Sequence, residues 1–126
     1  MRKKASLIST AASVAALLGS LCLTGPAVAA EKEGAKSVVE QGKELAFGRK
    51  KGNCLACHAI EGGELAGTIG PPLVAMKMRF PNKQDLFDQI WDARVKNPNT
   101  IMPPFGPHEI LTKEEIEKVT EFIYTL

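Results

Sequence analysis

Two cysteines and a histidine stand close together near the middle of the chain, as Cys54, Cys57 and His58. Two residues separate the cysteines, and the histidine directly follows the second of them. This C-x-x-C-H spacing is typical of the attachment site of a c-type haem. On a helical turn each thiol can add to one haem vinyl group, and the histidine then supplies the proximal iron ligand. The motif therefore predicts one covalent haem c, attached through Cys54 and Cys57 and ligated by His58.

Two other kinds of site also use closely spaced cysteines. A zinc site needs four ligands, and apart from the N-terminal Cys22 the chain offers only Cys54, Cys57, His58 and His108. Adjacent ligands such as Cys57 and His58 suit a tetrahedral zinc site poorly. A thioredoxin-like redox pair would follow a strand in a βαβ unit, and no strand pattern precedes this stretch. Haem attachment is therefore the interpretation that fits the spacing best.

The N-terminus has the pattern of a cleaved secretory signal peptide over residues 1–29. A basic start at Arg2–Lys4 precedes an apolar run, and Ala27–Ala29 forms an A-x-A cleavage site. Small polar residues interrupt the run, so a permanent membrane anchor is not expected. We therefore expect a flexible leader over residues 30–36 and a single exported, periplasmic domain over residues 37–126. Export agrees with the haem motif, because bacteria attach this cofactor outside the cytoplasm.

The charge of the predicted mature domain is close to neutral. The sequence has sixteen Lys and Arg and fourteen Asp and Glu, and three of the basic residues stand in the signal peptide. A role in binding nucleic acid is therefore not expected. A domain of this size has a thin core of its own, so the haem must supply much of the apolar interior.

Two helices of the predicted domain begin with the same capping signature. Ser37 is followed three residues later by Glu40, and Thr112 is followed three residues later by Glu115. In a capping box of this kind the two side chains satisfy each other's backbone N–H groups. The second of these helices should face the core with an apolar stripe made of Ile116, Val119, Phe122 and Ile123.

A third helix is predicted between these two, beginning at Asn82 and ending at Pro98. Its apolar stripe includes Trp91, which we interpret as a core residue, with contact to a haem propionate as the functional alternative. Gly42 lies inside the first predicted helix, where glycine costs about 1 kcal/mol relative to alanine. Such a glycine indicates the close approach of another helix. The basic run Arg49–Lys51 is either a solvated face or a contact for an acidic partner.

The ligand at the second axial position of the iron decides whether the site binds small molecules or transfers electrons. Four side chains are candidates, namely Met76, Met78, Met102 and His108. Met102 is favoured because the neighbouring threonine and prolines hold it in a stiff loop. Met76 and Met78 lie too near a di-proline turn to reach the opposite face of the haem easily, so they are interpreted as apolar contacts. His108, in an exposed loop, remains the main rival. Ligation by His58 and Met102 predicts a six-coordinate, one-electron relay.

Four segments together resemble a known family. The haem motif, the Gly-Pro-Pro-Leu turn at 70–73 and the Met-Pro-Pro loop at 99–106 resemble a class I cytochrome c. More narrowly, the segments 51–58, 67–73, 90–94 and 99–106 resemble SoxX, the mono-haem subunit of SoxAX cytochrome complexes. The resemblance implies an all-α fold whose N- and C-terminal helices cross around one covalent haem, with Gly42 packed against Phe122. It also implies that the carbonyl of Pro71 accepts a hydrogen bond from His58.

SoxAX complexes join thiosulfate oxidatively to a cysteine of the carrier protein SoxY, and the reacting cysteine belongs to SoxA. Haem attachment leaves this chain no spare cysteine after signal removal, so the resemblance implies the electron-relay subunit rather than the catalytic half. Its partners would be a SoxA-type cytochrome in a heterodimer, a SoxY-type carrier and a downstream cytochrome. The alternatives are a free-standing periplasmic electron carrier and a small haem catalyst with a displaceable sixth ligand.

Overall fold

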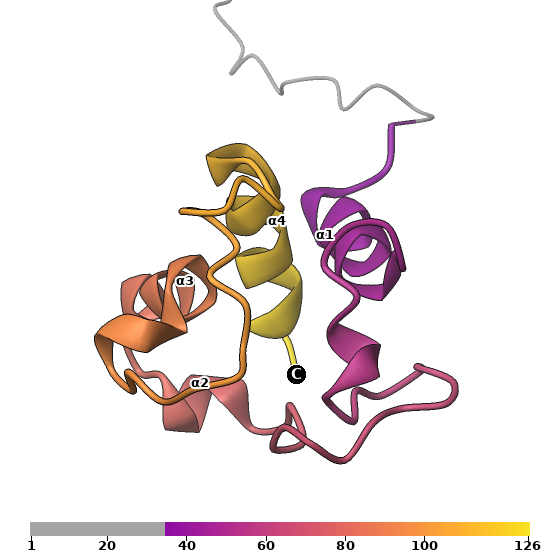
Figure 1. Ribbon diagram of the computed structural model, residues 1–126. Helices are drawn as coiled ribbons and strands as arrows, with labels where there is room; N and C mark the ends of the chain where they lie inside the picture. Colours follow the sequence, from indigo (N-terminus) through magenta and orange to yellow (C-terminus); the bar gives the residue numbers. More distant parts are fainter. Residues whose placement is uncertain (1–34) are drawn as a thin grey trace, which may run out of the picture. The chain divides into compact units, whose positions relative to one another are not determined.

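The computed structural model describes residues 35–126 (Figure 1). The predicted signal peptide and all but the last two residues of the predicted leader lie outside this part. Within it, the regular structure is entirely helical, in the order α1 (Val38–Phe47), η1 (Cys54–Ala56), α2 (Met76–Arg79), α3 (Lys83–Trp91), η2 (Ala93–Val95) and α4 (Lys113–Ile123). The predicted all-α fold is confirmed. No helix among the described residues is long and apolar enough to cross a bilayer.

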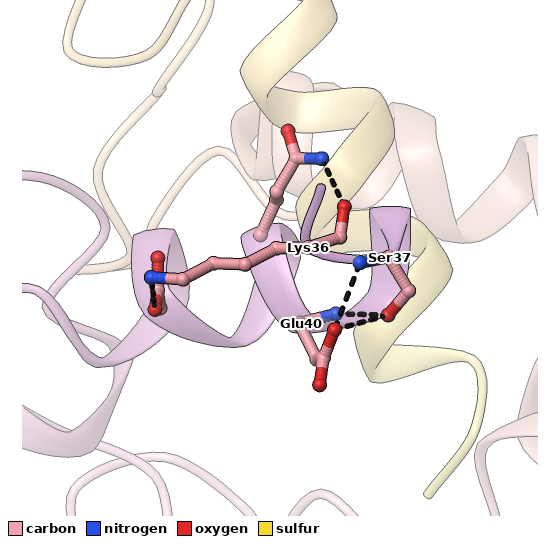
Figure 2. Close-up of polar contacts among 5 residues, drawn as sticks. Lys36, Ser37 and Glu40 are labelled. Atoms are coloured by element: carbon pink, nitrogen blue, oxygen red, sulfur yellow. Dashed lines mark hydrogen bonds and ion pairs between the residues drawn. The ribbon is translucent and has the colours of Figure 1, made fainter. Parts of the chain in front are cut away.

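Helix α1 begins with the capping box that the sequence predicts (Figure 2). The backbone N–H of Glu40 donates to Ser37 Oγ over 3.2 Å, and the backbone N–H of Ser37 donates to Glu40 Oε2 over 2.8 Å. Lys36 adds two contacts to the same turn, an ion pair with Glu44 and a backbone carbonyl that accepts from Gln41 Nε2. The capping box satisfies a backbone N–H of the first turn, which has no partner inside the helix, and the Lys36 contacts join side chains of α1 to the residue before its N-cap.

Helices α1 and α4 pack against each other (Figure 1). The predicted capping box of Thr112 and Glu115 begins α4, and the predicted apolar stripe of this helix is buried. The rings of Phe47 on α1 and Phe122 on α4 meet edge to face, with centroids 5.7 Å apart. Gly42 faces α4, where a β-carbon would overlap the carbonyl of Lys118 and stand 3.0 Å from Phe122 Cβ. The close helix contact predicted from Gly42 is therefore confirmed.

Helix α3 begins at Asn82 as predicted, but it ends at Trp91 and not at Pro98. The backbone of Asp92 is extended, with φ −151° and ψ 92°. Its carboxylate then accepts from the backbone N–H of Arg94 over 3.1 Å and from the guanidinium over 2.8 Å. Asp92 thus begins the separate turn η2, which the apolar pattern alone did not distinguish from a continuing helix.

The short helix α2 was not predicted. Its N-cap residue Ala75 has φ 51°, and the N–H of Met76 donates to the carbonyl of Leu126 over 2.9 Å. Met76 is buried, with 1% of its surface exposed, whereas Met78 on the same helix is 83% exposed. The interpretation of both methionines as apolar contacts therefore holds for Met76 and is wrong for Met78.

Candidate haem-binding site

The cysteines and the histidine of the C-x-x-C-H motif lie on one tight turn. The turn η1 carries Cys54, and the N–H groups of Cys57 and His58 donate to the carbonyl of Cys54 over 3.2 and 2.9 Å. Gly52 lies just before the turn, where a β-carbon would stand 3.3 Å from Cys54 Sγ and 2.9 Å from the carbonyl oxygen of Leu45. Only glycine lets the chain pass this close to α1. All three side chains of the motif line the same cavity.

The environment of the thiols argues against a reactive redox pair. Burial raises the pKa of the Cys54 thiol to about 11. A nucleophilic cysteine needs the opposite shift, because the thiolate is the reactive form. No strand precedes the motif within residues 35–126, so the βαβ setting of thioredoxin-like proteins is also missing from this part.

The His58 ring is held by the di-proline turn. Its Nδ1 lies 2.7 Å from the carbonyl oxygen of Pro71, the distance of a hydrogen bond in which the ring N–H donates. This bond leaves the lone pair on Nε2 for a metal. Gly70 lies against the ring, and a β-carbon there would stand 2.6 Å from Nδ1. The sequence pattern identified the prolines as rigid, but not the role of Gly70 in making room for the imidazole.

Met102 lines the same cavity as His58. It is half-buried, and its backbone N–H donates to Thr100 Oγ1 over 3.2 Å. Gly106, at the end of this loop, packs so closely on the Trp91 ring that a β-carbon would overlap it, and its N–H donates to the carbonyl of Trp91 over 3.1 Å. Thr100 therefore braces the backbone at Met102, and the Gly106 end of the loop is held against Trp91.

The cavity has a volume of about 510 Å³. Apolar side chains from α3, α4 and the loops between them form much of its wall, among them Leu86, Ile90, Phe105, Leu111, Val119 and Ile123. Three cations, Arg49, Lys51 and Arg79, also line it, and no carboxylate does so among the described residues. Two thiols, an imidazole, a thioether, an apolar wall and three cations fit a covalent haem, which is a flat apolar ring with two carboxylates.

The other candidate ligands are placed differently. Met76 lines the cavity, but its sulfur lies 3.5 Å from Arg79 Nη1 and its side chain is buried. Met78 and His108 are exposed and do not line the cavity. No three His, Cys, Asp or Glu side chains come together to hold a metal ion within residues 35–126, so the described part offers no zinc site.

Trp91 is not among the residues that line the cavity. Its ring stacks on Phe87, with centroids 5.9 Å apart and an interplanar angle of 22°. Trp91 therefore supports the Met102 loop through its contact with Gly106, without lining the cavity itself. The sequence offered no signal for this contact beyond the two residue types.

One residue of the basic run Arg49–Lys51 is engaged in an ion pair within the protein. Lys51 forms an ion pair with Glu115 at 2.6 Å, and Glu115 also belongs to the capping box of α4. The pair joins the loop before the haem motif to the start of the last helix. Sequence reasoning missed it because the two residues are far apart in the chain.

Comparison with known proteins agrees with this geometry. The family model described as cytochrome c oxidase, cbb3-type, subunit III matches residues 37–123. The chain belongs to this cytochrome c family. Membership implies covalent haem c and supports a role in electron transfer.

A solved structure gives a narrower likeness for this cytochrome. It matches a chain of the crystal structure of SoxXA from P. pantotrophus with a TM-score of 0.63 and 29% sequence identity. The match covers 73% of this cytochrome and 83% of that chain. The fold is therefore the small class I cytochrome c fold, and the cytochrome is SoxX-like.

A curated relative matches a shorter part. An uncharacterised lipoprotein of Aquifex aeolicus (strain VF5) is 33% identical over 78 residues, which are 61% of this cytochrome. The cytochrome spans 38% of the length of that lipoprotein.

Proposed function

We propose that this cytochrome is the electron-transfer subunit of a SoxAX-type complex, which joins thiosulfate to a cysteine of a SoxY-type carrier protein. The observation that carries the proposal is that His58, Met102 and both motif cysteines line one apolar cavity. The likeness to a chain of SoxXA supports the narrower assignment.

The residues of the cavity have distinct roles in this proposal. Cys54 and Cys57 would hold one haem through thioether bonds, and His58 and Met102 would supply its two iron ligands. Pro71 fixes the tautomer and the orientation of the His58 ring through its carbonyl. The bound haem supplies one-electron exchange between ferrous and ferric iron. Because Thr100 braces the Met102 backbone and Gly106 is held against Trp91, the loop would present the thioether in one position in either charge state of the iron.

The electron count sets what the partners must do. Joining a thiol to thiosulfate forms one S–S bond and releases one proton and two electrons. A relay with one haem takes one electron at a time, so it must pass electrons to a downstream cytochrome twice in each event. Both cysteines of the domain are taken up by haem attachment. The catalytic cysteine of the complex, which is distinct from the cysteine of the carrier protein, therefore belongs to the SoxA-type partner.

The mouth of the cavity provides the surface for that partner. Ile69 and Ile101 line the cavity and are 66% and 76% exposed. Large apolar side chains exposed beside a redox cofactor are favourable at an interface, where their burial contributes to binding. The predicted signal peptide, the family of c-type cytochromes and the lipoprotein relative all support a site of action outside the cytoplasm.

The test is purification of the haem-loaded protein from its native host. We expect a second haem polypeptide to co-purify, one haem per copy of this chain, and reduction by thiosulfate only when the carrier protein is present. Isolation of a stable monomer that thiosulfate does not reduce under any of these conditions would instead support a free-standing electron carrier.

A further inference from the structure

The guanidinium of Arg79 contacts the carbonyl of Pro72, and the carbonyl of the preceding residue, Pro71, faces His58. Arg79 is the last residue of α2, and its Nη1 donates to the carbonyl oxygen of Pro72 over 2.8 Å. The same nitrogen lies 3.5 Å from the sulfur of Met76, which is buried and therefore fixed. This side chain thus ties α2 to the di-proline turn.

The middle of the di-proline turn has no backbone hydrogen bond donor that could fix its conformation. The ends of the turn are held, because the N–H of Gly70 donates to the carbonyl of Cys57 over 2.8 Å and that of Leu73 donates to the carbonyl of Ala59 over 2.9 Å. Between these bonds, Pro71 and Pro72 have fixed φ angles and no N–H of their own. Their ψ angles are the remaining soft dihedrals, and they set where the two carbonyls point.

Side chains hold both of these carbonyls. Pro71 accepts from His58, and Pro72 accepts from Arg79. Within residues 35–126, Arg79 forms none of the ion pairs that engage Lys36, Lys51, Lys83, Arg94 and Lys118. No protein carboxylate in the described part therefore competes with Pro72 for the guanidinium, although Arg79 also lines the cavity that would hold the haem carboxylates.

We propose that Arg79 is a positioning residue for His58. By fixing the Pro72 carbonyl, Arg79 restricts the di-proline turn to the arrangement in which the Pro71 carbonyl faces the His58 ring N–H. The strength of that hydrogen bond sets the basicity of the imidazole as an iron ligand. The inference rests on the proposed function, because it takes His58 as the proximal ligand.

The test compares two variants of the haem-loaded protein, Arg79→Met and Lys77→Met. Both remove one positive charge from α2, but Lys77 neither lines the cavity nor contacts the turn. The measurement is the exchange rate of the His58 ring N–H with solvent, followed by NMR in the ferrous state. We expect exchange to be about two- to fivefold faster in Arg79→Met, because complete loss of an ordinary hydrogen bond would give at most about tenfold and the variant only weakens it. Lys77→Met should exchange like the parent protein.

Arg79→Lys serves as the conservative variant, since its ammonium is a donor that reaches toward the same carbonyl. We expect its exchange rate to lie closer to the parent protein than that of Arg79→Met. Equal rates in Arg79→Met and the parent protein, or an equal acceleration in Lys77→Met, would overturn the inference. The absorption spectrum tests the proposed function separately, because it reports whether a methionine ligates the iron. If that ligation is present and the exchange rate is unchanged in Arg79→Met, only the role of Arg79 is contradicted. Thermal unfolding of each variant shows that exchange is measured on folded protein.

Discussion

Gly42 on α1 packs directly against the backbone carbonyl of Lys118 on α4, so closely that a β-carbon at position 42 would overlap that carbonyl. The obstacle is backbone rather than a flexible side chain, so it cannot move aside by changing rotamer. Helices α1 and α4 are therefore in contact at a residue that has no side chain.

Replacement of Gly42 by alanine should destabilise the protein although alanine is the better helix former. The propensity gain is about 1 kcal/mol, whereas forcing a methyl group into a packed interface costs about 1–3 kcal/mol or more. Because the overlap is with backbone, the cost lies at the upper end of this range, and we expect a net loss of about 2 kcal/mol in the free energy of unfolding, measured by denaturant titration of the haem-loaded protein. Lys43→Ala on the exposed side of the same turn is the control and should cost less than about 1 kcal/mol. A loss no larger than that of the control would show that the helices can separate without cost.

The capping boxes and the Gly42 contact were predictable because each depends on few residues. A capping box needs only two side chains three positions apart, so Ser37 with Glu40 and Thr112 with Glu115 can be identified from sequence. Gly42 stands out because glycine inside a helix requires a reason. The haem motif is equally local.

The features that were missed depend on distant parts of the chain. Helix α2 has four residues, too few for an apolar period, and it begins at Ala75 in a left-handed conformation held by the C-terminal Leu126. The early end of α3 follows from the carboxylate of Asp92, which stabilises a new turn. The pair of Lys51 and Glu115 is long-range, and sequence periodicity carries no information about it.

Met102 should be the only methionine whose loss changes the iron coordination. Met102→Ala removes the thioether that lines the cavity, so the absorption band of methionine-to-iron ligation should disappear and the reduction potential should fall. The control is Met78→Ala, because Met78 is 83% exposed and does not line the cavity. A spectrum that survives Met102→Ala but changes in His108→Ala would assign the sixth ligand to His108.

The ion pair of Lys51 and Glu115 should make part of the stability depend on pH. The hydrogen bond from Lys51 and those at Thr112 hold the pKa of the Glu115 carboxyl below its ordinary value of 4.5. The folded state therefore binds this proton less tightly than the unfolded state. The stabilisation is fully present above about pH 4.5 and is lost as the pH falls through the lower folded pKa.

Glu115→Gln tests this dependence without removing the capping box, since glutamine also caps. The variant should be less stable than the parent protein by about 0.5–1 kcal/mol at pH 7, because Lys51 is half exposed and solvent screens the pair. The difference should shrink below pH 4.5 and at high salt. Glu114→Gln is the control, since Glu114 is largely exposed in its pair with Lys118. A difference that stays constant with pH would mean that charge plays no part.

A charge at the cavity mouth should weaken binding to the SoxA-type partner. Ile101 is 76% exposed, so Ile101→Asp should leave folding and the absorption spectrum unchanged while it places a carboxylate in the proposed interface. We expect the Kd for the partner to rise at least about tenfold, as for a central interface residue. Val95 is 82% exposed but does not line the cavity, so Val95→Asp is the matched control and should bind normally. Equal effects of the two substitutions would mean that the partner does not cover the mouth, and slower thiosulfate-dependent reduction in Ile101→Asp alone would link the interface to electron transfer.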